Sequence, residues 1–278
     1  RFGEQRSERL GTACVAPVDG RESVETAQGH RQIPRVAMVR CAMILPPVDS
    51  DDRSPMSAAL HEDLTSLDPE SLRARIRARV LAEPTFDVGY DWRLASIGAS
   101  AAQRPRRPFP DSPVHAAVLV PLVERASGIT VLLTQRASHL KTHAGQISFP
   151  GGRIEPQDVD PVAAALREAE EEIGLARDRV EIVGFLPDHL VISGFRVTPV
   201  VAFVQPEFSL TIDATEVEEA FEMPLAHVLE PRNHLPRTRW FDGYEVEFTD
   251  LAFESRIIWG ATAGMLLTFY RMLGASRP

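Results

Sequence analysis

The chain has 278 residues, 44% of them hydrophobic, which is enough for one sizeable buried core and additional segments. Its formal net charge of −9 and isoelectric point near 5.4 argue against a protein that coats nucleic acid, and binding of an acidic ligand would need a local basic cluster and a metal ion. The sequence has no apolar run approaching the roughly 20 residues that a membrane-spanning helix requires.

Residues 1–55 mix arginines with acids, contain scattered Gly and Pro, and show little periodicity. We expect a disordered leader, or upstream sequence translated ahead of a start at Met56; a regulatory tail is the alternative. Both cysteines, Cys14 and Cys41, lie in this region. The rest of the chain therefore has no thiol for a disulfide framework or a nucleophile, which fits a reducing compartment, and we expect a cytoplasmic protein.

Residues 56–112 are expected to contain an N-terminal helix and a linker rich in Pro and Arg. Asp68 followed by Pro69 predicts a helix start, and apolar residues then repeat every four positions, at Leu72, Ile76 and Val80. The same helix carries Arg73, Arg75, Arg77 and Arg79. These arginines either form a solvated basic face or lean towards an anionic ligand.

Residues 113–278 are predicted to form one domain. Apolar, β-branched runs predict a hairpin over 115–124 and 129–136, short strand 147–149, strands 180–186 and 197–204, and a hairpin over 240–253. Helices are predicted at 161–173 and 257–273, with a short helix or turn at 216–222. The first is bounded by Asp160-Pro161 and Gly174. This order predicts an α/β fold with a mixed β-sheet sandwiched between α-helices (α/β/α).

Three glutamates share one face of the helix predicted at 161–173. Glu168, Glu171 and Glu172 are spaced i, i+3, i+4, so their like charges repel. A hard divalent cation such as Mg²⁺ would offset this repulsion and keep coordination sites for water and phosphate. The turn at Gly151-Gly152 can present backbone N–H groups to phosphate oxygens. Together these features suggest hydrolysis of a phosphate anhydride, although the glutamates alone are equally consistent with a solvated acidic face.

The segment from Gly152 to Leu175 resembles the Nudix box, which reads Gly, five residues, Glu, seven residues, then Arg-Glu-apolar-x-Glu-Glu-x-Gly-apolar. The second half of this pattern matches from Arg167 onwards without a mismatch. The first half departs, because Asp158 replaces the glutamate and eight residues separate it from Arg167. The family's first glutamate therefore has no equivalent here, and a role for Asp158 or Glu155 is left open.

A second block is similar to the extra motif of the coenzyme A pyrophosphatase branch of the Nudix hydrolases. That motif reads Leu-Leu-Thr-x-Arg-Ser/Ala, three residues, Arg, three residues, Gly, three residues, Phe-Pro-Gly-Gly. This chain follows it over 132–152 with Arg136, Gly145 and Phe149 in place, and with Lys141 where the motif has arginine. Lysine keeps the positive charge but loses the planar two-pronged grip on phosphate. Further matches lie at 193–199, 216–225 and 258–263, and the likeness covers about 113–273.

The resemblance implies a Mg²⁺ or Mn²⁺ site. The helix spacing favours Glu168 and Glu172 as the main ligands and Glu171 as the third, and a carbonyl contact from Gly152 is implied by the family. Arg167 is expected to hold the glutamates in place electrostatically, unless it forms only a surface ion pair of little energetic value. Gly151 and Gly152 would supply the tight loop.

The general base is left open between a glutamate of the helix and an acid from a later loop, because Nudix enzymes use both. Glu216 and Glu219 are the loop candidates, and either would need a raised pKa. Arg136 and Lys141 are expected to bind phosphates, including the 3′-phosphate that marks coenzyme A. The other expected substrate-binding residues are Gly145, Phe149, Gly151, Gly152 and Phe195, and Phe195 could equally be a core residue. His139 and His143 flank Lys141 without Cys/His metal spacing and are predicted to be polar loop residues.

These expectations describe a metal-dependent hydrolase that splits coenzyme A or its thioesters into 3′,5′-ADP and 4′-phosphopantetheine or its acylated form. One alternative is a Nudix hydrolase for another nucleoside diphosphate derivative, such as ADP-ribose or a nucleotide sugar. The other is a non-catalytic nucleotide-binding module with the same fold. In each case we expect a small-molecule ligand, no nucleic-acid or membrane partner, and a monomer or homodimer.

Overall fold

The computed structural model describes residues 63–85, 112–191, 193–241 and 244–274, all of which belong to the compact unit Pro47–Pro278. The expected leader with Cys14 and Cys41 lies outside the described residues, as does most of the expected linker. Within the described part of the chain, no helix is both long and apolar enough to cross a lipid bilayer.

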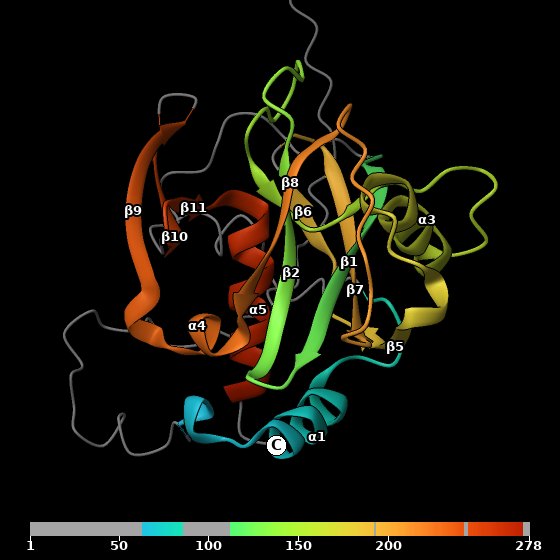
Figure 1. The fold of residues 1–278 in the computed structure, drawn as a ribbon. Helices are drawn as coiled ribbons and strands as arrows, with labels where there is room; N and C mark the ends of the chain where they lie inside the picture. Colours follow the sequence, from blue (N-terminus) through green and yellow to red (C-terminus); the bar gives the residue numbers. More distant parts are fainter. Residues whose placement is uncertain (1–62, 86–111, 192, 242–243, 275–278) are drawn as a thin grey trace, which may run out of the picture. The chain divides into compact units, whose positions relative to one another are not determined.

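A mixed sheet forms the centre of the domain (Figure 1). Its strands are β1 (Val114–Arg125), β2 (Gly128–Arg136), β3 (Ile147–Ser148), β4 (Gly151–Arg153), β5 (Val180–Phe185), β6 (His189–Val191), β7 (Phe195–Val204) and β8 (Val217–Pro224). The main path runs β3-β2-β1-β7-β5, while β4 pairs with β1, β6 with β7 and β8 with β2. The predicted β1–β2 hairpin is confirmed, and β1 also pairs with β7 in parallel.

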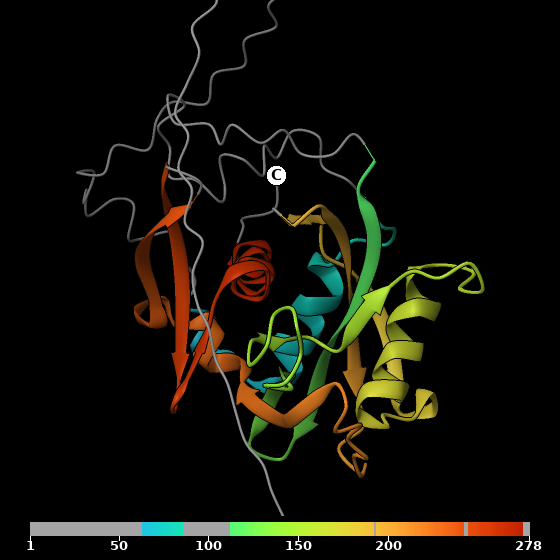
Figure 2. The same cartoon turned by 90° about the horizontal axis from the view of Figure 1, so that it is seen from above.

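Helices cover both faces of this sheet. Figure 2 shows α3 (Pro161–Ile173) on one side, and α5 (Gly260–Gly274) with α1 (Pro69–Arg79) on the other. Each face has its own apolar cluster, in which Ala165, Ala169 and Ile173 pack on the α3 side and Ile76 and Phe269 on the opposite side. The predicted α/β/α sandwich is therefore confirmed.

Helix α1 is fastened to the domain by its basic residues. Its predicted start is confirmed, because the side chain of Asp68 accepts hydrogen bonds from the first backbone amides of the helix. Arg73 pairs with Glu124 and Glu181, and its guanidinium lies 4.5 Å from the centroid of the Phe203 ring. Arg77 also pairs with Glu181, at 2.5 Å. These two arginines therefore bind the domain itself.

A second, three-stranded sheet lies beside α5 (Figure 1). It consists of β9 (His234–Phe241), β10 (Tyr244–Phe253) and β11 (Arg256–Ile258) in the order β11-β10-β9. The predicted hairpin is confirmed but begins six residues earlier, at His234, and its turn at 242–243 lies outside the described residues. A short helix, α4 (Leu225–Leu229), connects β8 to this sheet through a 3-10 turn, Pro231–Asn233.

Two predicted elements are wrong. The segment 216–222 is not a helix or turn, because Val217–Pro224 forms strand β8, antiparallel to β2. The helix predicted from residue 257 begins only at Gly260, since Arg256–Ile258 forms β11, where exposed Ile257 alternates with buried Ile258. In both segments pairing to a neighbouring strand overrides a local sequence that is compatible with helix.

Candidate active site

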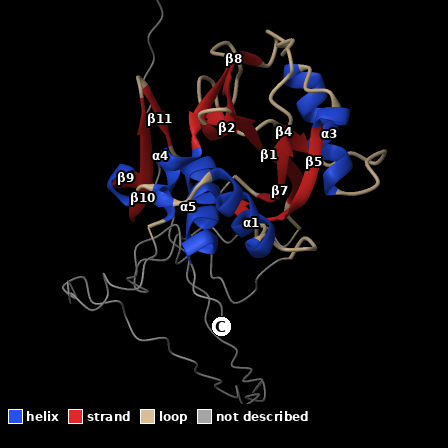
Figure 3. Cartoon of the chain, turned by 60° about the horizontal axis from the view of Figure 1, so that its bottom comes forward, coloured by secondary structure: helices blue, strands red, loops and turns tan. Residues whose placement is uncertain are grey.

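Helix α3 lies beside strand β4, whose first two residues are Gly151 and Gly152 of the predicted glycine turn (Figure 3). The side chain of Asp160 caps the helix start by accepting from the amide of Ala163, and Gly174 ends the helix in the left-handed conformation with φ of 66°. Both predicted boundaries are confirmed. Because the helix packs through Ala165 and Ala169, the neighbouring Glu168 and Glu172 are carried on the side that faces strand β4.

The glycine turn fits against these carboxylates only because it lacks side chains. A Cβ atom on Gly152 would overlap the carboxylate of Glu168, and one on Gly151 would overlap the backbone of β1 at Ala117. Gly151 also has φ of 153°, which L residues rarely adopt. Its backbone amide donates to Oε2 of Glu172 at 3.2 Å. The two glycines thus bring the backbone of β4 into direct contact with the acidic face of α3.

Glu172 is the buried carboxylate of the group, with 3% of its surface exposed. Its pKa is raised to about 8, mainly by burial and to a smaller extent by the negative charges of Glu168 and Glu216. The amide of Gly151 and the guanidinium of Arg136 oppose this shift, but the nearest nitrogen of Arg136 is 3.8 Å from Oε1 of Glu172. Glu172 is therefore a buried acid whose charge is only partly offset by the protein.

Arg167 organises the outer side of the site. Its Nε and Nη2 each lie 3.0 Å from a different oxygen of Asp158, and its Nη1 lies 3.1 Å from Glu168 and 2.8 Å from Glu171. The side chain of Asp158 is only 4% exposed, and its hydrogen bonds from Arg167 lower its pKa. The backbone amide of the exposed Glu155 also donates to Asp158. Asp158 therefore fixes the arginine that contacts two of the glutamates.

The three glutamates do not all converge on one point. Glu171 is turned towards Arg167 and its side chain is 60% exposed. Throughout the residues that the structure describes, no group of three or more His, Cys, Asp or Glu side chains is gathered closely enough to hold a metal ion. Glu168 and Glu172 meet at the glycine turn, however, and their oxygens are the hard ligands that Mg²⁺ and Mn²⁺ prefer. The negative charge of ionised Glu172 is only partly offset by the protein, and a divalent cation could offset the rest. Such a cation would need a further ligand from Glu171, Glu216 or the backbone.

The two loop acids occupy different environments. Glu216 is exposed in the turn before β8, and its charge contributes to raising the pKa of both Glu168 and Glu172. Glu219 lies within β8 and forms an ion pair of 2.5 Å with Arg256. The structure therefore brings Glu216 towards the carboxylates of α3, whereas Glu219 is neutralised by a partner from β11.

The expected substrate-binding residues fall into two groups. Arg136 at the end of β2 reaches Glu172, and Lys141 lies exposed in the loop that follows. Phe195 is partly buried at the start of β7, where the guanidinium of Arg153 lies 5.5 Å from its ring centroid. Phe149 is different, because it is only 2% exposed and packs in the hydrophobic core. Its burial argues against contact with a ligand. The packing of its ring in the core instead fixes the backbone just before Gly151.

Comparison with known proteins identifies the family. The family profile described as NUDIX domain matches residues 113–254. This chain belongs to the Nudix family. Nudix hydrolases generally use divalent metal ions such as Mg²⁺ or Mn²⁺, and carboxylate oxygens such as those of Glu168 and Glu172 are of the kind that these ions bind.

The chain is similar to Nudix hydrolases from several organisms. The uncharacterized Nudix hydrolase NudL of Escherichia coli O7:K1 is 40% identical over 160 residues, which cover 58% of this chain and 83% of that protein. NudL of Shigella flexneri is 39% identical over 162 residues, covering 58% and 84%. Among solved structures, an Ap4A hydrolase binary complex from C. elegans aligns with a TM-score of 0.35 and 22% identity, over 40% of this chain and 80% of that chain.

Some residues that shape this Nudix site could not be assigned from the sequence. The sequence leaves the role of Asp158 open and does not indicate its pairing with Arg167; the available signal is an acid separated from Gly152 by five residues. No sequence pattern indicates a structural role for Asp188. It accepts hydrogen bonds from Arg196 at 2.5 Å and from Thr198 at 2.8 Å, so these residues of the 193–199 block stabilise the start of β7.

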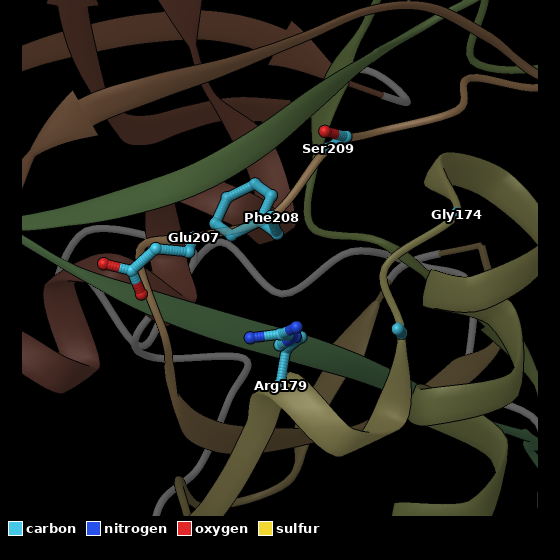
Figure 4. A pocket seen from close by; sticks show the side chains of 6 residues that line it. Gly174, Arg179, Glu207, Phe208 and Ser209 are labelled. Carbon is cyan, nitrogen blue, oxygen red and sulfur yellow. The ribbon is translucent and has the colours of Figure 1, made fainter.

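A separate pocket of about 470 Å³ lies next to the C-terminal end of α3. Figure 4 shows Arg179, Glu207 and Phe208 around it, and Gly174, Ala176 and Ser209 complete its lining. None of the carboxylates at the glycine turn lines this pocket. This pocket is therefore distinct from the candidate active site formed by α3, the end of β2 and the glycine turn.

Proposed function

We propose that this Nudix hydrolase is a coenzyme A diphosphatase. The observation that carries the proposal is the position of Arg136, the arginine of the branch-specific block, whose guanidinium lies 3.8 Å from the buried carboxylate of Glu172. A cation at this position can bind a substrate phosphate next to the carboxylates that would hold the metal. Exposed Lys141, five residues further on, offers a second positive charge for the 3′-phosphate of coenzyme A.

The proposed ligands for Mg²⁺ or Mn²⁺ are Glu168 and Glu172, with Glu171 and the carbonyl of Gly152 as further candidates. When bound, the metal would supply positive charge to the diphosphate and lower the pKa of a bound water. Arg167 keeps the carboxylate of Glu168 in place against the glycine turn, through contacts of 3.1 Å to Glu168 and 3.0 Å to Asp158. Such positioning matters because a misplaced group raises the reaction barrier.

Glu216 is our preferred general base. It accepts the proton of the attacking water as the new phosphorus–oxygen bond forms and the bridging phosphorus–oxygen bond breaks, so that the products are 3′,5′-ADP and 4′-phosphopantetheine. Glu216 is exposed and close enough to Glu168 and Glu172 for its charge to act on both of them, whereas the carboxylate of Glu219 is engaged in an ion pair with Arg256. We further propose a cytoplasmic enzyme that acts on a small molecule.

Incubation with coenzyme A and Mg²⁺ or Mn²⁺ tests the proposal, with ADP-ribose and a nucleotide sugar assayed in parallel. We expect 4′-phosphopantetheine to be released, with a higher kcat/KM for coenzyme A than for the other two substrates. Preference for ADP-ribose or the nucleotide sugar would reject the assigned substrate, and absence of turnover with all three would favour a nucleotide-binding module.

Matched variants test the residue roles. Glu168→Gln and Glu172→Gln should each lower kcat by about a hundredfold or more, because each removes a charged ligand. Glu216→Gln should lower kcat by about a hundredfold, the usual contribution of a general base, while Glu219→Gln should retain most activity. Equal losses in the Glu216 and Glu219 variants would contradict the assignment of the base.

A further inference from the structure

The segment that follows β2 and the segment that precedes β8 are hydrogen-bonded to each other. We define the arm as residues 137–145 and the acidic turn as residues 213–216. The amide of Ala137 donates to the carbonyl of Glu216 at 2.8 Å, and the amide of Ser138 donates to the carboxylate of Glu218 at 3.2 Å. The start of the arm thus runs directly beside the residue proposed as general base.

His139 makes the side-chain link between the arm and the acidic turn. Its Nε2 lies 3.2 Å from the carbonyl oxygen of Thr215, and because a carbonyl can only accept, the ring must donate. The acidic turn is also closed internally, since the amide and hydroxyl of Thr215 donate to Asp213 at 2.8 and 2.7 Å. His139 therefore hydrogen-bonds to a turn that is already closed by its own contacts, at Thr215, the residue before Glu216.

The far end of the arm faces solvent and carries the proposed phosphate ligand. Residues 141–145 are all exposed, and Lys141 lies two residues beyond His139. The arm is closed at its base, because the amide of Gly145 donates to the carbonyl of Arg136 at 3.0 Å. An anion that binds Lys141 and Arg136 would therefore restrain the arm at its tip and at its base.

We propose that His139 is a positioning residue that couples substrate binding by the arm to the placement of Glu216. This inference rests on the proposed function, because it requires an anionic substrate at Lys141 and catalysis by Glu216. The hydrogen bond from His139 transmits the restraint to the acidic turn, so the carboxylate of Glu216 is held relative to Glu168 and Glu172 when substrate is bound.

Kinetics of three variants of the full chain test this coupling. His139→Ala removes the donor, His139→Gln keeps an N–H donor, and His143→Asn is the matched control. His143 lies in the same arm, its ring is hydrogen-bonded to the nearby side chain of Gln146, and its φ is 57°, which asparagine tolerates. For coenzyme A we expect kcat to fall about tenfold in His139→Ala with KM within about twofold, to recover mostly in His139→Gln, and to fall much less in His143→Asn than in His139→Ala.

Dephospho-coenzyme A, which lacks the 3′-phosphate, separates coupling from general damage. It engages the arm less, so its kcat in the parent protein should already be lower and should change little in His139→Ala. The kcat ratio between the two substrates should therefore collapse towards one in that variant. An equal loss with both substrates, or the same loss in His143→Asn, would overturn the positioning role.

Hydrogen exchange gives a readout that does not depend on turnover. Binding of 3′,5′-ADP should slow amide exchange over residues 215–218 in the parent protein and much less in His139→Ala. If 3′,5′-ADP leaves these amides unprotected in the parent, or protects them equally in both proteins, the coupling is refuted. Failure of the parent to split coenzyme A would instead refute the proposed function, and the two failures are thus observed in different assays.

Discussion

Replacement of Glu172 by glutamine tests whether a buried carboxylate with a raised pKa is the site of metal binding. The pKa of Glu172 is raised to about 8, chiefly by burial and further by Glu168 and Glu216. A group with this pKa is charged in roughly one molecule in ten at pH 7 and one in a hundred at pH 6. Because a cation requires the charged form, its affinity should fall about tenfold for each pH unit below 8, and binding near pH 7 should release about one proton.

Calorimetric titration with Mn²⁺ at several pH values, in two buffers that differ in ionisation enthalpy, measures the affinity and the proton release together. In Glu172→Gln, both the strong pH dependence and the released proton should be lost together with most of the affinity. Glu171→Gln is the matched control, because its carboxylate is exposed and should leave proton release unchanged. An affinity that does not depend on pH in the parent protein, or equal proton release in Glu172→Gln, would refute the reasoning.

The same pKa predicts a stability difference in the metal-free protein. The folded state binds a proton at Glu172 between about pH 4.5 and 8, whereas the unfolded state does not, so stability should fall as the pH rises through this range. The difference in unfolding free energy between parent and Glu172→Gln should change by a few kcal/mol at most over the range. Urea unfolding at several pH values measures it, and added Mn²⁺ should reduce it.

Three further changes have defined outcomes. Gly152→Ala should lower kcat by about a hundredfold because its Cβ atom would displace the carboxylate of Glu168; a loss of less than about threefold would contradict this. Asp158→Asn replaces the carboxylate that accepts two hydrogen bonds from Arg167, so the unfolding free energy measured in urea should fall by about 2–3 kcal/mol and turnover should also fall. Unchanged values would argue against a role of Asp158 in holding Arg167. His189, whose pKa burial lowers to about 4, stabilises the fold above pH 6.5 and loses this contribution as the pH falls towards 4. In His189→Gln the fall in urea midpoint between pH 7 and 5 should therefore be smaller than in the parent.

Local signals in the sequence were sufficient for much of the fold. Asp160 and Gly174 specify the ends of α3 through a side-chain cap and a left-handed residue, and both effects depend only on nearby backbone. The β1–β2 hairpin was equally predictable from its β-branched runs. The shared face of Glu168 and Glu172 followed from helical spacing alone.

Long-range contacts account for what could not be predicted. The glutamates of β8 are good helix formers, yet that segment forms a strand because it completes the edge of β2. Glu171 is exposed and pairs with Arg167, and Glu219 pairs with Arg256, 37 positions away in the sequence. Helical spacing predicts which side chains share a face, but it does not determine which of them will pair with an arginine.

The packing of α1 and α5 has a consequence for fragments of this protein. The family match ends at residue 254 and begins at 113, so it contains neither helix, although both cover the same face of the sheet. Leu81, just after α1, exchanges backbone hydrogen bonds of 2.9 Å with Phe185 at the sheet edge. A fragment cut to the matched residues would expose the apolar sheet face that α1 and α5 cover, and the edge of β5 that pairs with Leu81. It should therefore precipitate or self-associate rather than fold.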